Sequence, residues 1–295
     1  MFKLKVESLT GQVLQLTQDE SNYQVVNIDG LTPPKASINS SIVAGMDGSK
    51  FNSSRLEPRN LVITLRLNGN VEQNRINLYK YFRTKQWCKV YYTNGSRDVY
   101  IEGYVESMDS DLFSISQRMQ ISIVCNNPFL QDAQEIVNDI SKVLGMFTFP
   151  FSFGANGAMY NPDSNTDDAI EFSTYNYERE TEIFNDSEDS VGVIIELTFR
   201  GVVDDPKIID TLSGDTFEIK GSYDIGDKIV INTNKSKKSV KLYRNGVESN
   251  LFSKLTIGST WFQLRVGSNL YSYSARRNDS FMRIVYKHHN IYEGV

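Results

Sequence analysis

The chain has 295 residues, of which 40% are hydrophobic and 23% charged, and its formal net charge is -5. These values are typical of a soluble globular protein of about two domains, and the acidic balance argues against a dedicated nucleic-acid binder. No stretch is long and apolar enough to span a membrane, and the N-terminal residues lack the apolar core of a signal peptide. We therefore expect cytoplasmic synthesis and no membrane insertion.

The first half of the chain alternates apolar and polar residues, as strands with one buried face do. The runs NLVITLRLNG (60–69) and QRMQISIVCN (117–126) follow this pattern, and Asn-Gly pairs such as Asn94-Gly95 supply the turns between them. Asp109-Ser110-Asp111 is interpreted as a polar hairpin tip. Residues 1–131 are therefore predicted to form a β domain.

One segment of this half has a helical period. From about residue 72 to 86, the side chains of Ile76, Tyr79 and Phe82 recur on one side, which predicts a single helix packed against the strands. Cys88 and Cys125 lie in apolar strand-like runs and are interpreted as buried free thiols.

A change of pattern follows Pro128, which ends a strand because the residue before a proline is forced out of helical geometry. Residues 132–168 are rich in Phe, Gly, Asn and Asp, and we expect a linker or irregular connector there. Short strands with frequent turns resume afterwards. Residues 169–295 are therefore predicted to form an all-β sandwich.

The sequence contains no arrangement that predicts catalysis. Asp167-Asp168 and the other adjacent acidic pairs cannot flank a substrate, because neighbouring residues on a strand face opposite ways. The same geometry prevents His288 and His289 from holding one metal ion together. We therefore predict no catalytic residue, no metal site and no cofactor, and we expect that the protein is not an enzyme.

The segment from Ser37 to Arg55 is long, polar and glycine-containing, yet it carries four apolar residues that need burial. A neighbouring subunit can shelter them, although the segment can also fold back on its own domain. We predict that it is an arm with an oligomer interface at Ile42, Val43, Met46 and Phe51.

The stretch STWFQLRVGSNLYSYSA (259–275) looks like one hairpin with aromatic residues on both arms. Phe262, Leu264 and Val266 form its cleaner apolar set and are predicted to face the core, so Trp261 faces the other way. A candidate partner or sugar contact is therefore placed at Trp261, Arg265 and Tyr271.

Several segments in order carry a resemblance to a known family. VAGMDGSKFNSSRLEPRNLVITLRLNGN, NRINLYKYFRTKQ and QRMQISIVCNNPFLQD resemble the first domain of the distal tail protein (Dit) family of phages that infect Gram-positive bacteria. GDKIVINTNKSKKSVKLYRNG and WFQLRVGSN are similar to that family's galectin-like sandwich. Two departures are the absence of a glycine near Ser187 and the replacement of a more usual proline by Arg265-Val266.

The resemblance implies a fold of a tail-tube-like β-barrel or sandwich with one flanking helix, followed by a galectin-like β-sandwich. It implies a virion structural protein of the tail tip or baseplate, made in the host bacterial cytoplasm. Its implied partners are five further copies in a hexameric ring, the tail tube protein, the tail-associated hub or lysin protein and a receptor-binding protein. DNA would pass through the ring without specific binding.

Alternatives of other classes remain open at this point. The chain can also be interpreted as a carbohydrate-binding module such as a cell-wall adhesin, as the equivalent part of a contractile phage-tail-like bacteriocin, or as a sandwich glycosidase. The adhesin predicts a monomer with a groove lined by Trp261 or Tyr271, and the glycosidase predicts two carboxylates across a cleft.

Overall fold

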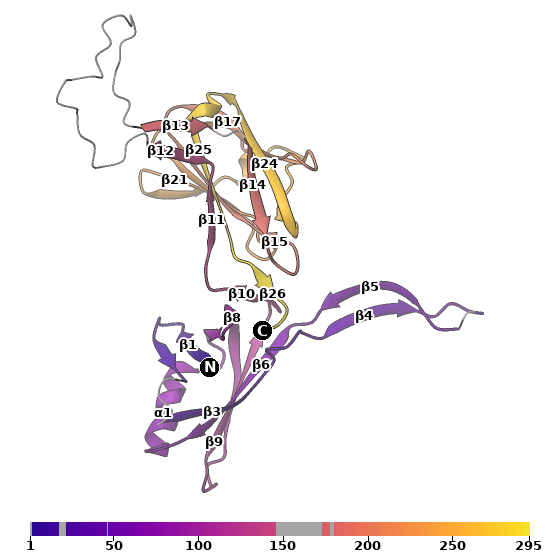
Figure 1. Ribbon diagram of the computed structural model, residues 1–295, viewed down its shortest axis with the longest axis vertical. Helices are drawn as coiled ribbons and strands as arrows, with labels where there is room; N and C mark the ends of the chain where they lie inside the picture. The colour runs from indigo at the N-terminus through magenta and orange to yellow at the C-terminus, as the bar shows by residue number, and fades with distance from the viewer. Residues whose placement is uncertain (1, 18–21, 46, 146–172, 178–179) are drawn as a thin grey trace, which may run out of the picture. The chain divides into compact units, whose positions relative to one another are not determined.

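The computed structural model describes residues 2–17, 22–45, 47–145, 173–177 and 180–295. The described residues form β-strands and one α-helix, so the mainly β fold class is confirmed. The chain divides into two compact units (Figure 1). Unit 1 comprises Met1–Ile136, Asp186–Val191 and His289–Val295, and unit 2 comprises Val137–Asn185 and Gly192–His288.

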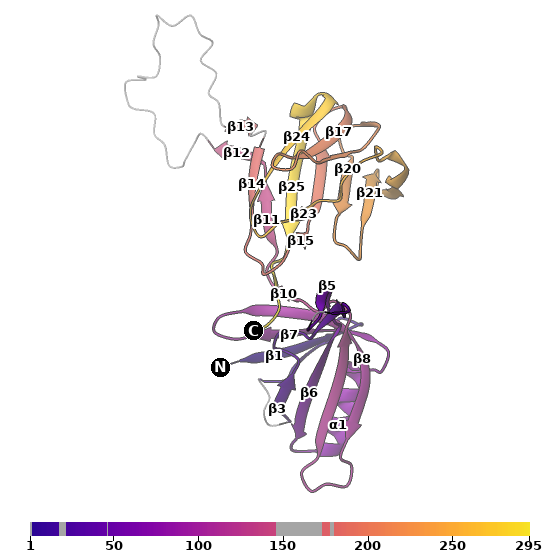
Figure 2. The ribbon, with the colours of Figure 1, turned by 90° about the vertical axis from the view of Figure 1, so that its right-hand side faces the viewer.

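Unit 1 is built on a sheet of nine strands, in the order β2-β1-β7-β8-β9-β6-β3, with β10 and β26 joined to it (Figure 2). A separate two-stranded hairpin, β4-β5, completes the unit. The elements are β1 (Lys3–Ser8), β2 (Val13–Gln15), β3 (Tyr23–Asp29), β4 (Ala36–Ser41), β5 (Lys50–Leu56), β6 (Arg59–Leu67), α1 (Val71–Tyr81), β7 (Trp87–Thr93), β8 (Asp98–Ser110), β9 (Arg118–Cys125), β10 (Leu130–Asp132) and β26 (Ile291–Tyr292).

The core of unit 1 follows from the period-two pattern of its strands. In β6 the side chains of Leu61, Ile63 and Leu65 are fully buried, and the residues between them are half-exposed. β6 pairs with β9 in an antiparallel register that places Ile63 opposite Ile121. Leu78 of α1 enters the same apolar cluster. The alternation predicted for these strands is confirmed.

The helix is shorter than predicted, and of the three residues expected to face the strands only Phe82 is buried. It ends at Tyr81 and not near residue 86, because Phe82 leaves helical geometry with φ -112° and ψ 69°. Beyond it, Lys85 adopts a positive φ of 67° and donates its backbone N–H to the carbonyl of Val105 at 2.8 Å. Leu78 and Phe82 are the buried residues of this segment. Ile76 and Tyr79, which were expected to face the strands, are each 42% exposed.

Unit 2 contains two larger sheets, a six-stranded one in the order β11-β25-β16-β20-β21-β22 and a five-stranded one in the order β14-β24-β17-β18, with β19 on β17. Two short pairs, β12-β13 and β15-β23, accompany them. The elements are β11 (Ile136–Asp139), β12 (Ser141–Gly145), β13 (Ser173–Tyr177), β14 (Glu180–Asn185), β15 (Val191–Gly192), β16 (Ile194–Phe199), β17 (Val203–Asp210), β18 (Thr216–Glu218), β19 (Ser222–Tyr223), β20 (Lys228–Asn232), β21 (Ser239–Arg244), β22 (Val247–Asn250), η1 (Phe252–Lys254), β23 (Gln263–Leu264), β24 (Gly267–Arg277), η2 (Asp279–Phe281) and β25 (Met282–His288).

The two larger sheets of unit 2 pack face to face as a sandwich. Tyr271 of β24 stacks on Tyr286 of β25, with ring centroids 5.5 Å apart, and Phe262 meets the same Tyr271 edge-on at 5.3 Å. The stretch 259–275 is not one hairpin, because β23 pairs with β15 and β24 pairs with β14 and β17. Phe262 and Leu264 are buried as predicted, whereas Val266 is 58% exposed.

The range 132–168, predicted to be an irregular connector, contains two strands, β11 and β12, and its part from 146 onward lies outside the described residues. β11 is a strand because it completes the sheet beside β25, a partner far along the chain. The range 169–295 also differs from unit 2. Residues 186–191 and 289–295 belong to unit 1, where β26 pairs with β10.

Candidate assembly surfaces

The hairpin β4-β5, here called the arm (residues 36–56), lies apart from the nine-stranded sheet (Figure 1). Its register pairs Ile38 with Ser54 and Ser40 with Phe51, with a bulge between Asn39 and Ser40. Directly paired residues share a face, and alternate residues of a strand return to the same face. Ile38 and Phe51 therefore share one apolar face of the arm.

No described part of the chain covers this apolar face. Ile38 is 68% exposed, Phe51 60% and Ile42, just beyond β4, 87%. An isolated two-stranded hairpin is marginally stable in water, and full burial of one large apolar side chain contributes about 1.5–3 kcal/mol. The arm therefore gains stability when another surface covers this face.

The structure brings together three of the four predicted interface residues. Ile42 and Val43 follow β4 at the far end of the arm, and Phe51 lies in β5; all three are exposed. Met46 lies outside the described residues. Ile38 was missed, although an apolar residue between the polar Ser37 and Asn39 is the signal of a strand with one apolar face.

A second exposed apolar surface lies at the tip of the β8-β9 hairpin, residues 111–117. Phe113 is 101% exposed and Ile115 109%, so neither side chain packs against the part of the chain that the structure describes. Asp109-Ser110-Asp111 was predicted to be a polar hairpin tip. The hairpin is present, but Asp109 and Ser110 lie in β8, and the tip beyond them is partly apolar. Its apolar residues were not predicted to matter, because single exposed apolar residues are common on protein surfaces.

In unit 2, the ring of Trp261 packs against neighbours of its own unit. Phe252 stacks on it at 5.7 Å, Phe217 meets it edge-on at 5.2 Å, and the Nζ of Lys238 lies 5.5 Å from its centroid. Aromatic neighbours and a cation are typical surroundings of an aromatic packing residue. This arrangement favours a structural Trp261 over a sugar platform.

The other two residues of this candidate contact have different roles. The Nη2 of Arg265 donates to Oδ2 of Asp210 at 2.6 Å, in an ion pair whose carboxylate is buried. Tyr271 was predicted to be a surface contact, but it is fully buried between the sheets, so this prediction is wrong. Trp261, Arg265 and Tyr271 therefore do not form one binding surface.

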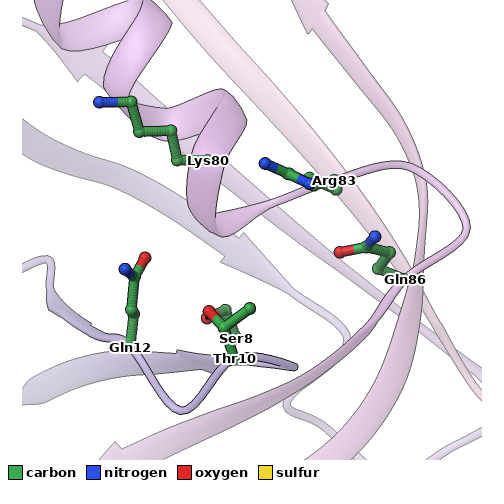
Figure 3. A pocket seen from close by; sticks show the side chains of 6 residues that line it. All are labelled: Ser8, Thr10, Gln12, Lys80, Arg83 and Gln86. Atoms are coloured by element: carbon green, nitrogen blue, oxygen red, sulfur yellow. The ribbon is translucent and has the colours of Figure 1, made fainter.

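A small depression of about 190 Å³ lies in unit 1 between the β1-β2 turn and the end of α1 (Figure 3). All of its lining side chains are polar, two are cationic and none is acidic: Ser8, Thr10, Gln12, Lys80, Arg83 and Gln86. These groups can contact an anion weakly. They include no nucleophile paired with a base, as covalent catalysis requires.

The two cysteines are structural. Burial raises the pKa of Cys88 to about 12, with a further contribution from Cys125, whose own pKa burial raises to about 12. Both therefore remain neutral thiols at physiological pH, and neither is activated as a nucleophile. Among the described residues, no group of three or more His, Cys, Asp or Glu side chains is placed to hold a metal ion, and no helix is long and apolar enough to cross a membrane.

Two family models match the chain. A phage tail protein RIFT-related domain matches residues 10–125, and the C-terminal domain of a siphovirus-type tail component matches residues 186–289. Together these ranges cover more than half of the chain. No curated protein sequence matches it.

Solved structures match along nearly the full length. The Dit protein of phage SPP1, described as a paradigm of the hub adsorption apparatus of phages that infect Gram-positive bacteria, is 12% identical with a TM-score of 0.67, over 98% of this chain and 99% of that chain. A chain of the phage P2 baseplate in its activated conformation with Ca is 11% identical with a TM-score of 0.57, over 100% of both chains. The same baseplate with Sr gives 11% identity and a TM-score of 0.55, over 98% of both chains.

These likenesses agree with the two-unit β architecture and with the resemblance in the sequence. The matched domains fall on the sheet of unit 1 and on the sandwich of unit 2. The chain belongs to the siphovirus distal tail (Dit) protein family, whose members are structural proteins of the phage tail.

Proposed function

We propose that six copies of this chain form a ring at the distal end of the tail. Unit 1 makes the ring, which joins the tail tube protein to the tail-associated hub or lysin protein, and unit 2 carries receptor-binding components. The chain acts through shape and interfaces, without turnover, and is made in the host cytoplasm before it enters the virion. The solved relatives, a hub protein and baseplate chains, support this proposal.

The exposed apolar face of the arm carries the proposal. A ring requires two different surfaces on each subunit, one of which meets the other on the next copy. The arm is one such surface, because it stands apart from its own sheet and presents Ile38 and Phe51 to solvent. In the ring, the neighbouring copy covers this face.

The charge of the chain suits passage of DNA through the ring. With a formal net charge of -5, the subunit has no excess of cations with which to hold phosphates. DNA therefore moves past it without specific binding.

The arm contact is tested by Phe51→Asp, with Ser53→Asp as its matched control. Ser53 lies two residues away but pairs with Asn39 on the opposite, polar face. We expect the control to keep the mass of the parent assembly in light scattering, and Phe51→Asp to give folded single chains or a broken ring. A Phe51→Asp assembly of unchanged mass and stability would exclude the arm as a ring contact.

A further inference from the structure

Arg59 begins β6 directly after the arm, yet only 3% of its surface is exposed. Its Nε donates to the carbonyl of Pro128 at 2.8 Å. Nη1 donates to the carbonyl of Gly30 and Nη2 to that of Glu293, each at 2.5 Å. Burial lowers the pKa of the guanidinium, but an arginine stays charged at physiological pH. One buried cation therefore joins three segments that are distant in the sequence.

A second arginine holds the same final residues. The Nη1 of Arg97 donates to the carbonyl of Gly294 at 3.0 Å, and its guanidinium carbon lies 3.9 Å from the ring centroid of Tyr292. The Nη2 of Arg97 donates to Oε1 of Glu188 at 3.0 Å. Oε2 of Glu188 accepts from the backbone N–H of Glu293 at 2.6 Å. Residues 292–294 are therefore fixed by side-chain and backbone contacts.

These fixed residues also touch the segment that leads into the arm. The backbone N–H of Val295 donates to the carbonyl of Leu31 at 3.2 Å. At Gly294, an added Cβ would lie 2.9 Å from Cδ of Pro33, which shows how closely the two backbones approach. Leu31 and Pro33 precede the arm and Arg59 follows it. The two segments that flank the arm, residues 31–33 and Arg59, are here called its root, and residues 293–295 therefore hold both of them.

We propose that Arg59 and residues 293–295 form a brace that sets the direction in which the arm leaves unit 1. Arg59 is then a positioning residue for the contact with the neighbouring copy, and this inference rests on the proposed role of the arm. Six residues of extended strand span about 20 Å, so a turn of about 10° at the root moves the far end by about 3–4 Å. A misplacement of that size removes a packed apolar contact.

The brace is tested by Gly294→Val, which drives a side chain against Pro33. The matched control is Gly95→Val, because a Cβ at Gly95 meets no atom within 4 Å. Spin labels are attached at Asn39→Cys on the arm and Gln120→Cys on β9, and the two native cysteines are buried and do not react. Pulsed electron double resonance then gives the distribution of label distances in dilute, single chains.

We expect one narrow distance distribution in the parent chain and in Gly95→Val. In Gly294→Val the distribution shifts by several ångströms or broadens. Arg59→Lys keeps the charge but cannot donate to three carbonyls from one planar group, so its distance distribution should also shift or broaden. Loss of stability alone does not move the labels of a folded molecule, and thermal unfolding of each labelled variant shows that it is folded.

If Gly294→Val and Arg59→Lys both fold and keep the label distances of the parent chain, the brace proposal is wrong. If Gly294→Val does not fold, the decision rests on Arg59→Lys, because it introduces no clash. The measurement is made on single chains, so its result is independent of whether six copies form a ring. Failure of the ring proposal is recognised separately, by the mass of Phe51→Asp.

Discussion

Gly103 of β8 occupies a position in unit 1 that has no room for a side chain. An added Cβ would lie 2.6 Å from Cγ2 of Ile123, 2.8 Å from Sγ of Cys125 and 2.8 Å from the carbonyl oxygen of Val124. Real Cβ atoms do not approach neighbours so closely. In Gly103→Ala, the strands β8 and β9 must therefore move apart locally or Ile123 must leave its preferred rotamer.

Overpacking of this kind costs about 1–3 kcal/mol of folding free energy. In a unit of this size, 1 kcal/mol changes the unfolding temperature by about 2–4 °C, so we expect Gly103→Ala to lower it by about 2–12 °C. Only part of this strain can relax, because one of the three close atoms is a backbone carbonyl oxygen in β9.

Scanning calorimetry measures this difference, with Gly95→Ala as the control. Gly95 lies in the turn between β7 and β8, where an added Cβ meets no atom within 4 Å. The control should melt at or slightly above the temperature of the parent chain, since alanine restricts the unfolded state. A Gly103→Ala variant as stable as the control would show that the register of β8 on β9 is wrong.

Three further outcomes are expected in unit 2. The hydrogen bond from Arg244 lowers the pKa of Asp227 below its usual 3.8. This carboxylate therefore stabilises the fold above that pH and stabilises it less as the pH falls. In Asp227→Asn, the melting temperature should fall less on acidification than it does in the parent chain. Trp261→Ala removes packing within the sandwich and should lower the melting temperature of unit 2, while light scattering shows an unchanged assembly mass. The hydroxyl of Tyr271 is buried and has no hydrogen-bond partner among the residues that the structure describes, so Tyr271→Phe should unfold in urea at the same concentration as the parent chain or a higher one.

Much of the fold could be predicted because burial on one face leaves a period of two in the sequence. The predicted apolar faces of β6 and β9 are buried, and so are Phe262 and Leu264, although Ser122 on the other face of β9 is buried as well. Residues 136–139 gave no such signal. They form a strand because a partner far along the chain, β25, is available beside them.

The surfaces were harder to predict for a different reason. A tyrosine suits both a core and a binding face, so only the packing of the sandwich places Tyr271 inside. An arginine is expected on the surface, and Arg59 is buried only because three carbonyls from separate segments converge on it. The apolar residues of the arm were recognisable, since small polar neighbours gave them no shelter along the chain.

The return of residues 289–295 to unit 1 has a consequence for synthesis on the ribosome. β10 receives its partner β26 only after all of unit 2 has been translated, because Ile291 follows the sandwich in the chain. At about 5–20 residues per second, this interval lasts about 10–30 s. During that time the carbonyl of Glu293 does not yet exist for Arg59, and the root of the arm is incomplete. The root of the arm is therefore completed only after the sandwich of unit 2 has been synthesised.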